Sequence, residues 1–500
     1  MKKKILAFIL MFSLLFGALP LFYSSAEDVG GFNGILRAGE DTFDGPVYEA
    51  DFCEGEVISS ADSQEHAEEI AAYYGLELDS YAWGVAVYKT PDPEAAVERS
   101  EIMAEAAISP KGFITKRKTP SNIPELELNY IYHIDEDEAP APEPQAPPMA
   151  LSAAAPVYAP INPNQWHHAA MDNPRAWEIT TGEGVVVAVL DTGVNPNHTD
   201  FGGDKLTPNS YDAYRDLIGL EYMFDGYGHG THVASIIASP FDKGENYYGT
   251  APGARIMAIK INSGSDSSFS SFALARGINY AAENGADVIN ISGGSAGMIT
   301  ETNIIYVAIK NAYAKGVVIV CAAGNEKSDL PYSPAAVPET ISVANTTSSN
   351  SLGIWSNFGP YIDIAAPGTD IYAANYGNSG YTFHSGTSMA SPNVAGVAAL
   401  VKSVHPEYTV EQVKQVLFST ARRAGELNNG KDYYFGHGIV NSYAAVLGPD
   451  ACYNVTYDFN DGHASVTIKA APGSKLFQPS DFLASTASRK LCSPGRLSPQ

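Results

Sequence analysis

Between residues 166 and 447, short apolar runs alternate with segments of helical periodicity, and this alternation restricts the fold more than any other feature. Residues 184–190 read GVVVAVL, a continuous apolar run that is typical of a strand buried on both faces. Similar runs lie at residues 256–261, 286–291, 316–322 and 340–343, with helical segments such as 272–283 and 304–314 between them. The pattern predicts an α/β fold, in which a mainly parallel twisted sheet carries helices on both faces.

A segment rich in alanine and proline separates this region from the N-terminal part of the chain. Residues 139–163 contain APAPEPQAPPMALSAAAP, a composition that predicts an extended, exposed linker open to proteolytic cutting. The preceding part, 27–138, carries expected helices at 63–74 and 94–107 and expected strands at 82–88 and 126–134. Two helices interleaved with strands predict a small α+β unit of ferredoxin-like type. We therefore expect a large unit at 164–448, followed at 449–500 by a short β-like extension and an irregular tail.

The charge of the chain is strongly acidic and unevenly distributed. The formal net charge is −26, and 27 acidic but only 7 basic side chains lie between residues 27 and 148. Phosphate contacts need clustered lysine and arginine, so this balance argues against a nucleic-acid-binding protein. We interpret the acidic part as a solvated surface.

The first 26 residues have the layout of an export signal. Three lysines follow Met1, an apolar run covers 5–22, and Ser24-Ser25-Ala26 offers small residues for a cleavage site. The alternative is an uncleaved anchor, because the apolar run is borderline in length for a membrane span. We expect a secreted, extracellular or cell-surface protein whose contact with a membrane is limited to this signal.

Four cysteines in 500 residues exclude a scaffold built on disulfides, although they do not exclude a single bridge. They lie far apart in the chain and fit no metal-ligand spacing. Cys321 lies in the apolar run VVIVCAAGN, which predicts a small buried strand residue.

Four glycine-rich motifs carry residues that nucleophilic acyl transfer requires. Asp191 lies in VVVAVLDTGV, His229 in GHGTHVAS and Ser388 in SGTSMASP. A serine is a poor nucleophile unless an imidazole takes its proton, and a carboxylate must hold that imidazole. Asn325 in CAAGNE offers an amide donor for an oxyanion. Each residue alone has a simpler structural explanation, but four such motifs in one order indicate a catalytic site.

On these motifs the chain resembles the subtilisin-like serine proteases, the subtilases, from about residue 165 to 447. The resemblance implies that Asp191 orients the imidazole, His229 is the general base, Ser388 is the nucleophile and Asn325 binds the oxyanion. It leaves His232, in the same motif as His229, as a packed structural residue. The G-x-S-x-G motif of another hydrolase fold does not apply, because Ala390 stands at its second glycine.

The resemblance also implies where substrate binds. Two segments are expected to line the groove: Ser292, Gly293 and Gly294 on one side, and Ala322, Ala323 and Gly324 on the other. An edge of this kind binds an extended peptide through backbone groups, so small residues suit it. Gly293 stands where many family members carry a larger apolar residue, and the preceding loop is serine-rich. We expected a more open or more polar distal subsite.

The family resemblance implies further partners and ligands. Asp200 in NPNHTDF matches a calcium ligand, and Gln165 is a second candidate, although Asp200 can equally be a plain surface carboxylate. Catalysis itself requires no cofactor. The small N-terminal unit resembles a prosegment, which chaperones folding, blocks the groove and is removed autocatalytically. The resemblance thus predicts a bacterial, secreted and monomeric endopeptidase acting on proteins or peptides. Alternatives are a non-enzymatic binding protein on the same fold, and an esterase or peptide ligase.

Overall fold

A computed structural model describes residues 51–108, 123–134, 161–241, 247–264, 266–424 and 431–448, and the backbone of 453–457 and 466–470. The expected export signal and residues 139–160 of the alanine- and proline-rich linker lie outside the described residues. Of the four cysteines, Cys53 and Cys321 are described, and both are free thiols. Cys321 is buried in a central strand, as the sequence predicts. Among the described helices, none is both long and apolar enough to span a bilayer.

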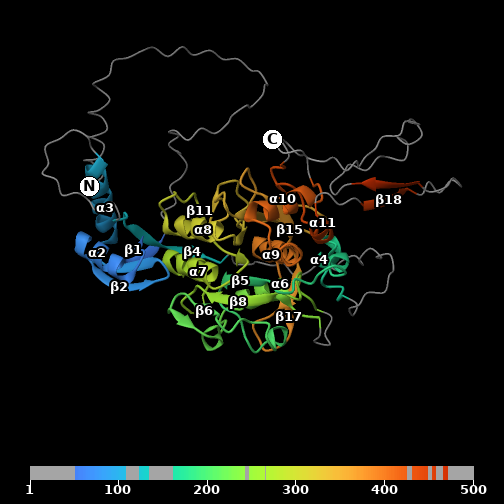
Figure 1. Cartoon of the computed structure of the whole chain (residues 1–500), viewed down its shortest axis with the longest axis horizontal. Coiled ribbons are helices and arrows are strands. Elements are labelled where there is room, and N and C mark those ends of the chain that lie inside the picture. Colours follow the sequence, from blue (N-terminus) through green and yellow to red (C-terminus); the bar gives the residue numbers. More distant parts are fainter. Residues whose placement is uncertain are drawn as a thin grey trace, which may run out of the picture. The chain divides into compact units, whose positions relative to one another are not determined.

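The small N-terminal unit is an antiparallel sheet combined with two helices (Figure 1). Its elements are β1 (Phe52–Ser60), α2 (Gln64–Tyr74), β2 (Glu77–Ala82), β3 (Val85–Lys89), α3 (Pro93–Ile108) and β4 (Glu127–His133). The strand order β2-β3-β1-β4, with one helix before β2 and one before β4, is that of a ferredoxin-like sandwich. The predicted helices and the predicted last strand agree with these bounds within two residues.

Local sequence explains how the first helix is delimited. The side chain of Ser63 accepts a hydrogen bond from the backbone N–H of His66, which caps α2 at its start. Gly75 ends the helix at φ 70°, a left-handed conformation that favours glycine. Between them, Ala67 and Ile70 belong to the buried face that covers the sheet.

The predicted strand at 82–88 is wrong at its beginning. Trp83 and Gly84 both have positive φ values, 50° and 81°, so the chain reverses there and β3 begins at Val85. The apolar run AWGVAVY therefore combines the end of one strand, a tight turn and the start of the next. The residues of this turn lie against the large unit.

The large unit is an α/β fold built on an eight-stranded sheet with the order β15-β14-β12-β10-β5-β8-β6-β7. Its strands are β5 (Val186–Asp191), β6 (Tyr211–Asp212), β7 (Leu217–Ile218), β8 (Arg255–Lys260), β10 (Val288–Ile291), β12 (Val318–Ala322), β14 (Ile341–Thr346) and β15 (Ile364–Pro367). Every pair is parallel except β6 and β7. The long apolar runs found in the sequence are the central strands, so the fold predicted from their alternation with helices is confirmed.

Helices cover the sheet on both faces. They are α4 (His167–Ala170), α5 (Asn173–Ala176), α6 (His229–Ala238), α7 (Ser271–Glu283), α8 (Ile304–Ala314), α9 (Thr387–Val404), α10 (Val410–Thr420) and α11 (Ser442–Leu447), with 3₁₀ turns η1 (Thr199–Phe201) and η2 (Leu220–Tyr222). Helix α10 begins with a capping box formed by Thr409 and Gln412. Shorter strands complete the unit: β9 (Ser268–Ser270), β11 (Ser295–Ala296), β13 (Tyr332–Ser333), β16 (Ile371–Ala374) and β17 (Tyr381–His384). Beyond it, β18 (Tyr453–Tyr457) and β19 (Val466–Ala470) form an antiparallel hairpin.

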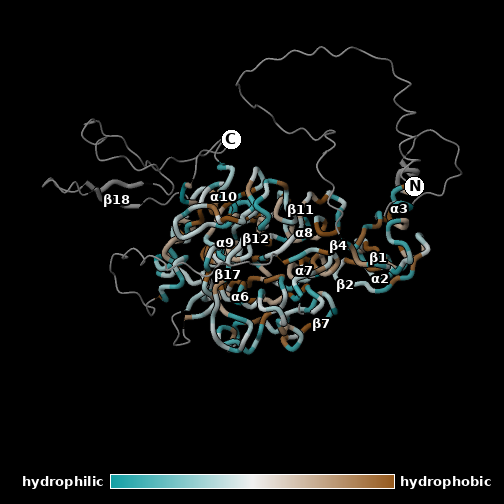
Figure 2. The backbone as a smooth tube through the Cα atoms, turned by 180° about the vertical axis from the view of Figure 1, so that it is seen from behind, coloured by the Kyte–Doolittle hydropathy of each residue, from teal (hydrophilic) through white to brown (hydrophobic). Residues whose placement is uncertain are grey.

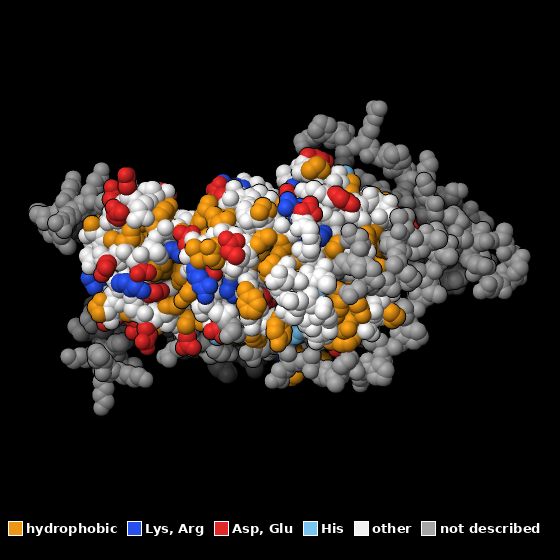
Figure 3. Space-filling model, turned by 90° about the horizontal axis from the view of Figure 1, so that it is seen from below, with side chains coloured by type: hydrophobic (Ala, Val, Ile, Leu, Met, Phe, Trp, Pro, Cys, Tyr) orange, Lys and Arg blue, Asp and Glu red, His pale blue; other side chains and the backbone are white. Residues whose placement is uncertain are grey.

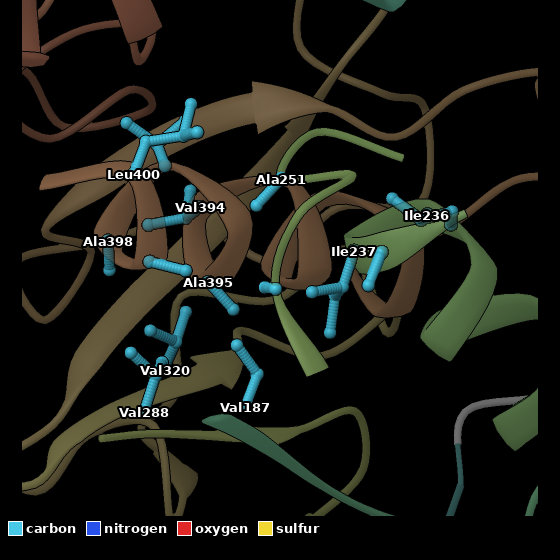
Figure 4. Close-up of a cluster of buried hydrophobic side chains, with 14 of the residues drawn as sticks. Val187, Ile236, Ile237, Ala251, Val288, Val320, Val394, Ala395, Ala398 and Leu400 are labelled. Atoms are coloured by element: carbon cyan, nitrogen blue, oxygen red, sulfur yellow. The ribbon is translucent and has the colours of Figure 1, made fainter. Parts of the chain in front are cut away.

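Alternate residues of each central strand face opposite hydrophobic clusters. Val187 and Val189 of β5 belong to a cluster with α6 and α9, whereas Ala188 and Leu190 belong to one with α7 and α8. Figure 4 shows the first cluster, where valines of three strands face α9 and Ile237 of α6. The hydrophobic stretches, brown in Figure 2, run through this region around α9, β12 and α6. Burial on both faces fixes the sheet, and with it the positions of the loops at its carboxyl edge.

Strand β4 of the small unit pairs with β9 of the large unit in antiparallel register. Tyr132 lies opposite Phe269, and the two units thereby share a five-stranded sheet.

The face drawn in Figure 3 carries acidic and basic side chains interspersed with hydrophobic ones. No basic field is visible on that face.

Candidate active site

The first two candidate residues lie in direct contact at the carboxyl edge of the central sheet. Asp191 is the last residue of β5, and His229 is the first residue of α6. Nδ1 of His229 lies 2.8 and 3.0 Å from the two carboxylate oxygens of Asp191, so it donates its proton to a buried carboxylate. This bond selects the tautomer whose Nε2 can accept a proton.

A second buried carboxylate, which the sequence analysis missed, holds the loop before α6. Oδ1 of Asp225 accepts hydrogen bonds from the hydroxyl of Thr192 (2.8 Å) and the N–H of Gly228 (2.7 Å). Its Oδ2 accepts from the N–H and the hydroxyl of Thr231, at 2.9 and 2.7 Å. The network joins the turn after β5 to the first turn of α6, and so fixes the distance between Asp191 and His229. An aspartate three residues before Gly228 is the signal that could have found it.

Gly230, the second glycine of the GHGTH motif, is required because the backbone of Gly193 lies very close to it. A Cβ atom on Gly230 would overlap the carbonyl oxygen of Gly193 and come within 3.0 Å of the Cβ of Asp191. Any larger residue would separate β5 from α6. Gly230 thus has a steric role in bringing carboxylate and imidazole together.

Ser388 lies in the first turn of α9, a helix that packs against α6. Its hydroxyl donates to the carbonyl oxygen of Ser292 at 3.2 Å, and the hydroxyl of Ser292 donates to the Ser388 carbonyl at 3.0 Å. The segment after β10 is thereby tied to the start of α9.

The side-chain amide of Asn325 is fixed at one end and unpartnered at the other. Its Oδ1 accepts hydrogen bonds from the N–H (2.9 Å) and the hydroxyl (3.1 Å) of Thr387, the residue before Ser388. Its Nδ2 is buried and has no hydrogen-bond partner among the described residues. A buried donor without a partner costs about 1–3 kcal/mol, which favours a site that binds a transient acceptor.

Comparison with known sequences identifies the family. The sequence model described as "Subtilase family" matches residues 182–438. The chain belongs to the subtilase family. Thermitase from Thermoactinomyces vulgaris is 38% identical over 276 residues, which make up 55% of this chain and 92% of thermitase. Subtilisin DY from Bacillus licheniformis is 38% identical over 274 residues, 53% of this chain and 91% of that protein.

Solved structures agree with this assignment. A protease from Pseudoalteromonas arctica matches with a TM-score of 0.50 and 31% identity, covering 57% of this chain and 96% of that protein. Fervidolysin from Fervidobacterium pennivorans, described as a keratinolytic enzyme related to subtilisin, matches with a TM-score of 0.67. That match covers 86% of this chain and 69% of fervidolysin at 24% identity, so it supports the fold alone. This subtilase is a serine endopeptidase of the subtilisin type, which sets aside a purely binding role.

One wall of the expected substrate groove is occupied by the small unit of the subtilase itself. The N–H of His133 donates to the Gly294 carbonyl at 3.2 Å, and the N–H of Gly294 donates back at 2.9 Å. The N–H of Ile134 donates to the carbonyl of Ser267 at 2.8 Å. A Cβ on Gly293 would lie 2.8 Å from the His133 carbonyl oxygen, so glycine leaves room for the paired chain. Residues 132–134 therefore lie between two edges as an added strand.

Phe269 adds an aromatic ring beside Gly293, where the sequence predicts a more open or more polar distal subsite. Phe269 of β9 lies 3.1 Å from the position of a Cβ on Gly293 and stacks on Tyr132, with ring centroids 5.7 Å apart and planes at 17°. Tyr132, Ile134 and Phe269 belong to one buried cluster. The sequence analysis overlooked Phe269 because the surrounding serines dominate that loop.

The other wall follows β12. Ala322 and Ala323 are buried, and Gly324 has φ 96°. The Nδ2 of Asn357 donates to the Ala323 carbonyl at 3.0 Å and also contacts the carboxyl of Glu326. Glu326 is thus held by Asn357, and this contact fixes the turn that carries Asn325.

The two expected calcium ligands are hydrogen-bonded within the protein, and the calcium site stays a prediction. Oδ2 of Asp200 accepts from the hydroxyl of Ser235 at 2.6 Å, and its Oδ1 accepts from the hydroxyl of Tyr381 at 2.7 Å. Oε1 of Gln165 accepts from the N–H of Tyr248 at 3.0 Å. Every oxygen of these two side chains already accepts a protein hydrogen bond, whereas calcium needs six to eight oxygens. In the part of the chain that is described, no cluster of three or more His, Cys, Asp or Glu suits a metal ion.

His232, the second histidine of the motif, is a packed residue. It is fully buried, its Nε2 lies 3.3 Å from the Thr382 carbonyl oxygen, and its ring lies edge-on to His384. Burial holds the pKa of His232 well below 6.5, so the ring is neutral. It lies one turn along α6 from His229, on a side that faces β17.

Proposed function

We propose that Ser388, His229 and Asp191 form the catalytic triad of this subtilase, and that it hydrolyses peptide bonds through an acyl-enzyme. The observation that carries the proposal is the buried contact between Asp191 and Nδ1 of His229, at the sheet edge beside the helix that bears Ser388. The carboxylate stabilises the imidazolium that forms when the imidazole accepts the serine proton. No cofactor takes part.

The steps follow from these positions. The Ser388 oxygen attacks the scissile carbonyl carbon while His229 takes the hydroxyl proton, which gives a tetrahedral oxyanion. The free amide of Asn325 and the N–H of Ser388, in the first turn of α9, donate to that oxyanion. His229 then protonates the leaving amine, and water attacks the acyl-enzyme with His229 as base. We assign the substrate backbone to the two walls described above, with Ser292, Gly293 and Gly294 on one side and Ala322, Ala323 and Gly324 on the other.

We propose further that residues 27–138 are a prosegment that inhibits the enzyme until it is cut off. Support comes from the backbone pairing of His133 and Ile134 with Gly294 and Ser267, because this segment fills the wall that a substrate would use. The composition of residues 1–26 supports export, so we place the mature, monomeric enzyme outside the cell. Its substrates are extracellular proteins or peptides.

The decisive experiment compares the full-length protein with its Ser388→Ala variant. We expect the parent to shorten itself at a bond beyond Ile134, to cut denatured casein and to carry one phenylmethylsulfonyl group on Ser388 after inhibition. The variant should stay full length and inactive, with the same circular dichroism spectrum. A variant that still shortens itself and cuts casein would overturn the assignment of the nucleophile. Competing amines in the assay separate a hydrolase from a peptide ligase.

A further inference from the structure

The turn between β2 and β3 inserts an aromatic side chain into the large unit, away from the substrate groove. Trp83 sits at the tip of this turn with φ 50°, followed by Gly84 at 81°. Its ring meets the ring of Tyr280 edge-on, with centroids 4.7 Å apart and planes at 84°. The carbonyl of Trp83 accepts a hydrogen bond from Nδ2 of Asn279 at 2.8 Å.

The receiving surface is prepared by the large unit itself. Tyr280 of α7 stacks on Tyr211 of β6 at 4.1 Å and 13°, and the Tyr211 ring lies 6.3 Å from Trp83. Both tyrosines are buried in the cluster between the sheet and α7, and the Tyr280 hydroxyl donates to the carbonyl of Asn209. The two rings are therefore held in place by the large unit, whichever partner contacts them. A tryptophan on a rigid aromatic surface is typical of residues that dominate an interface.

A buried arginine lies beside this contact and forms no ion pair within 4.0 Å among the described residues. Arg276 of α7 is 3% exposed and donates from Nη2 to the hydroxyl of Ser80 in β2, at 2.7 Å. Its Nε has no hydrogen-bond partner among the described residues, and its guanidinium lies 4.8 Å from the Phe272 ring centroid. Docking of β2 thus removes a cation from water in exchange for one neutral hydrogen bond and the more distant attraction of carboxylates such as Asp79, and desolvation outweighs that attraction.

We propose that Trp83 and its socket of Tyr211, Asn279 and Tyr280 form a latch that holds the small unit on the enzyme after the linker is cut, and that buried Arg276 keeps this latch releasable. The inference rests on the proposed function in that the small unit is taken as the inhibitor. It extends that function by placing the control of release away from the groove. The latch uses none of the residues assigned to catalysis or substrate binding.

The test separates the latch from catalysis. A recognition site for a foreign, sequence-specific protease is inserted into the linker of the full-length Ser388→Ala protein, and the linker is cut with that protease. The rate at which the small unit leaves the large unit is then followed by size-exclusion chromatography. We expect Trp83→Ala to accelerate this loss by about 10- to 100-fold, the effect typical of removing a dominant interface aromatic. Tyr73→Ala, which removes an aromatic ring that contacts Tyr74 within the small unit, is the matched control and should change the rate less than twofold.

A change on the large unit should act in the opposite direction. Arg276→Met keeps a long side chain but removes the buried charge, so we expect the small unit to leave roughly tenfold more slowly. If circular dichroism shows that Trp83→Ala is unfolded, Asn279→Ala takes its place and should accelerate loss several-fold. Loss at the parental rate in the folded Trp83 or Asn279 variant would overturn the latch, and faster loss in Arg276→Met would overturn the role of the arginine. Failure of the parent with intact Ser388 to cut casein would count against the proposed function alone.

Discussion

The small unit contacts the large unit in two chemically different ways. At the groove, the contacts of His133 and Ile134 with Gly294 and Ser267 join backbone atoms. The small unit also contacts helices α7 and α8 of the large unit, a surface that we call the helical face, and there each contact involves a side chain. Trp83 meets Tyr280, and a carboxylate oxygen of Glu127 accepts from the side chain of Asn303 and the N–H of Ile304 at the start of α8.

This difference shows how one surface can be general and another specific. Backbone groups are the same in every peptide, so a groove built from glycines and a strand edge can accept many sequences. Side-chain contacts distinguish partners, because each lost ring or carboxylate leaves a gap or an unpaired donor. Substrates need the first kind of contact alone, whereas the small unit uses both. We therefore expect the small unit to bind more tightly than a substrate of similar length.

The largest effect is expected from a change that leaves both kinds of contact intact. Asn325→Ala removes the unpartnered amide donor, and kcat should fall about 10²–10³-fold, the size known for the oxyanion-hole asparagine of a subtilisin. The matched control is Asn311→Ala at an exposed position of α8. The small unit should remain bound as in the parent, measured by co-elution after cutting of the linker. Normal turnover of a peptide substrate by Asn325→Ala would show that this amide does not bind the oxyanion.

A Cβ atom at position 293 should weaken the backbone contact between the groove and any bound peptide, whatever the sequence of that peptide. In Gly293→Ala the new atom would lie 2.8 Å from the carbonyl oxygen of the paired residue and 3.1 Å from the next Cα, so the added strand must move outward. Because a displacement of about 1 Å can cost 10²-fold, we expect kcat/KM to fall by up to that factor for all substrates alike. Gly202→Ala, where a Cβ meets nothing within 4 Å, is the control. A loss confined to some peptide sequences would contradict a backbone role.

The strands that are buried on both faces could be predicted from the sequence, whereas the short ones could not. Central strands such as β5 are buried on both faces and appear as continuous apolar runs, so their positions and the α/β fold followed directly. The motif residues at their ends were found because glycines and polar groups follow an apolar run. Two-residue strands such as β6 and β13 leave no such pattern, since they are defined by their partners in the fold.

Contacts between distant side chains could not be predicted. The hydroxyl that Tyr381 supplies to Asp200, from 181 residues away in the chain, has no signal in the sequence. Asp225 was missed because its role depends on backbone and hydroxyl donors of several residues around it, among them Thr192, Gly228 and Thr231. Trp83 was assigned to a strand because a tryptophan at positive φ has no local sequence signal. These positions require the folded arrangement, which a pattern of hydrophobicity does not contain.

The contact of Glu127 should make retention of the small unit depend on pH. Burial, with a smaller contribution from the negative charge of Glu125, raises the pKa of Glu127 to about 7 in the docked state, against 4.5 in water. The docked state thus takes up a proton, and its contribution to affinity is lost as the pH rises from 4.5 through 7. After cutting of the linker in the Ser388→Ala background, the small unit should leave roughly tenfold faster at pH 7 than at pH 5.

Glu127→Gln tests this origin, because the amide keeps an acceptor for Asn303 and Ile304 without a titrating group. It should flatten the pH dependence and slow the loss of the small unit at pH 7. Glu125→Gln, at the neighbouring carboxylate, should leave most of the dependence in place. An equally steep profile in Glu127→Gln would assign the effect to another group.

The smallest expected effect concerns the selection of a substrate side chain by Phe269 in the groove. A substrate in the register of residues 132–134 has its residue at the Ile134 position opposite Gly293, and the next residue opposite Ser292, whose carbonyl lies 3.2 Å from the Ser388 hydroxyl. That next residue carries the scissile carbonyl, so the position of Tyr132 is the fourth residue before the cut. Stacking on Phe269 is worth about 0.5–1.5 kcal/mol beyond burial, a preference of roughly 2- to 12-fold for tyrosine over leucine there. Phe269→Leu should abolish this preference in a competition between paired peptides while leaving kcat/KM for the leucine peptide within twofold. An unchanged preference would mean that stacking on Phe269 does not select the substrate. The groove would then recognise peptides through shape and backbone groups, and specific side-chain contacts would be confined to the helical face.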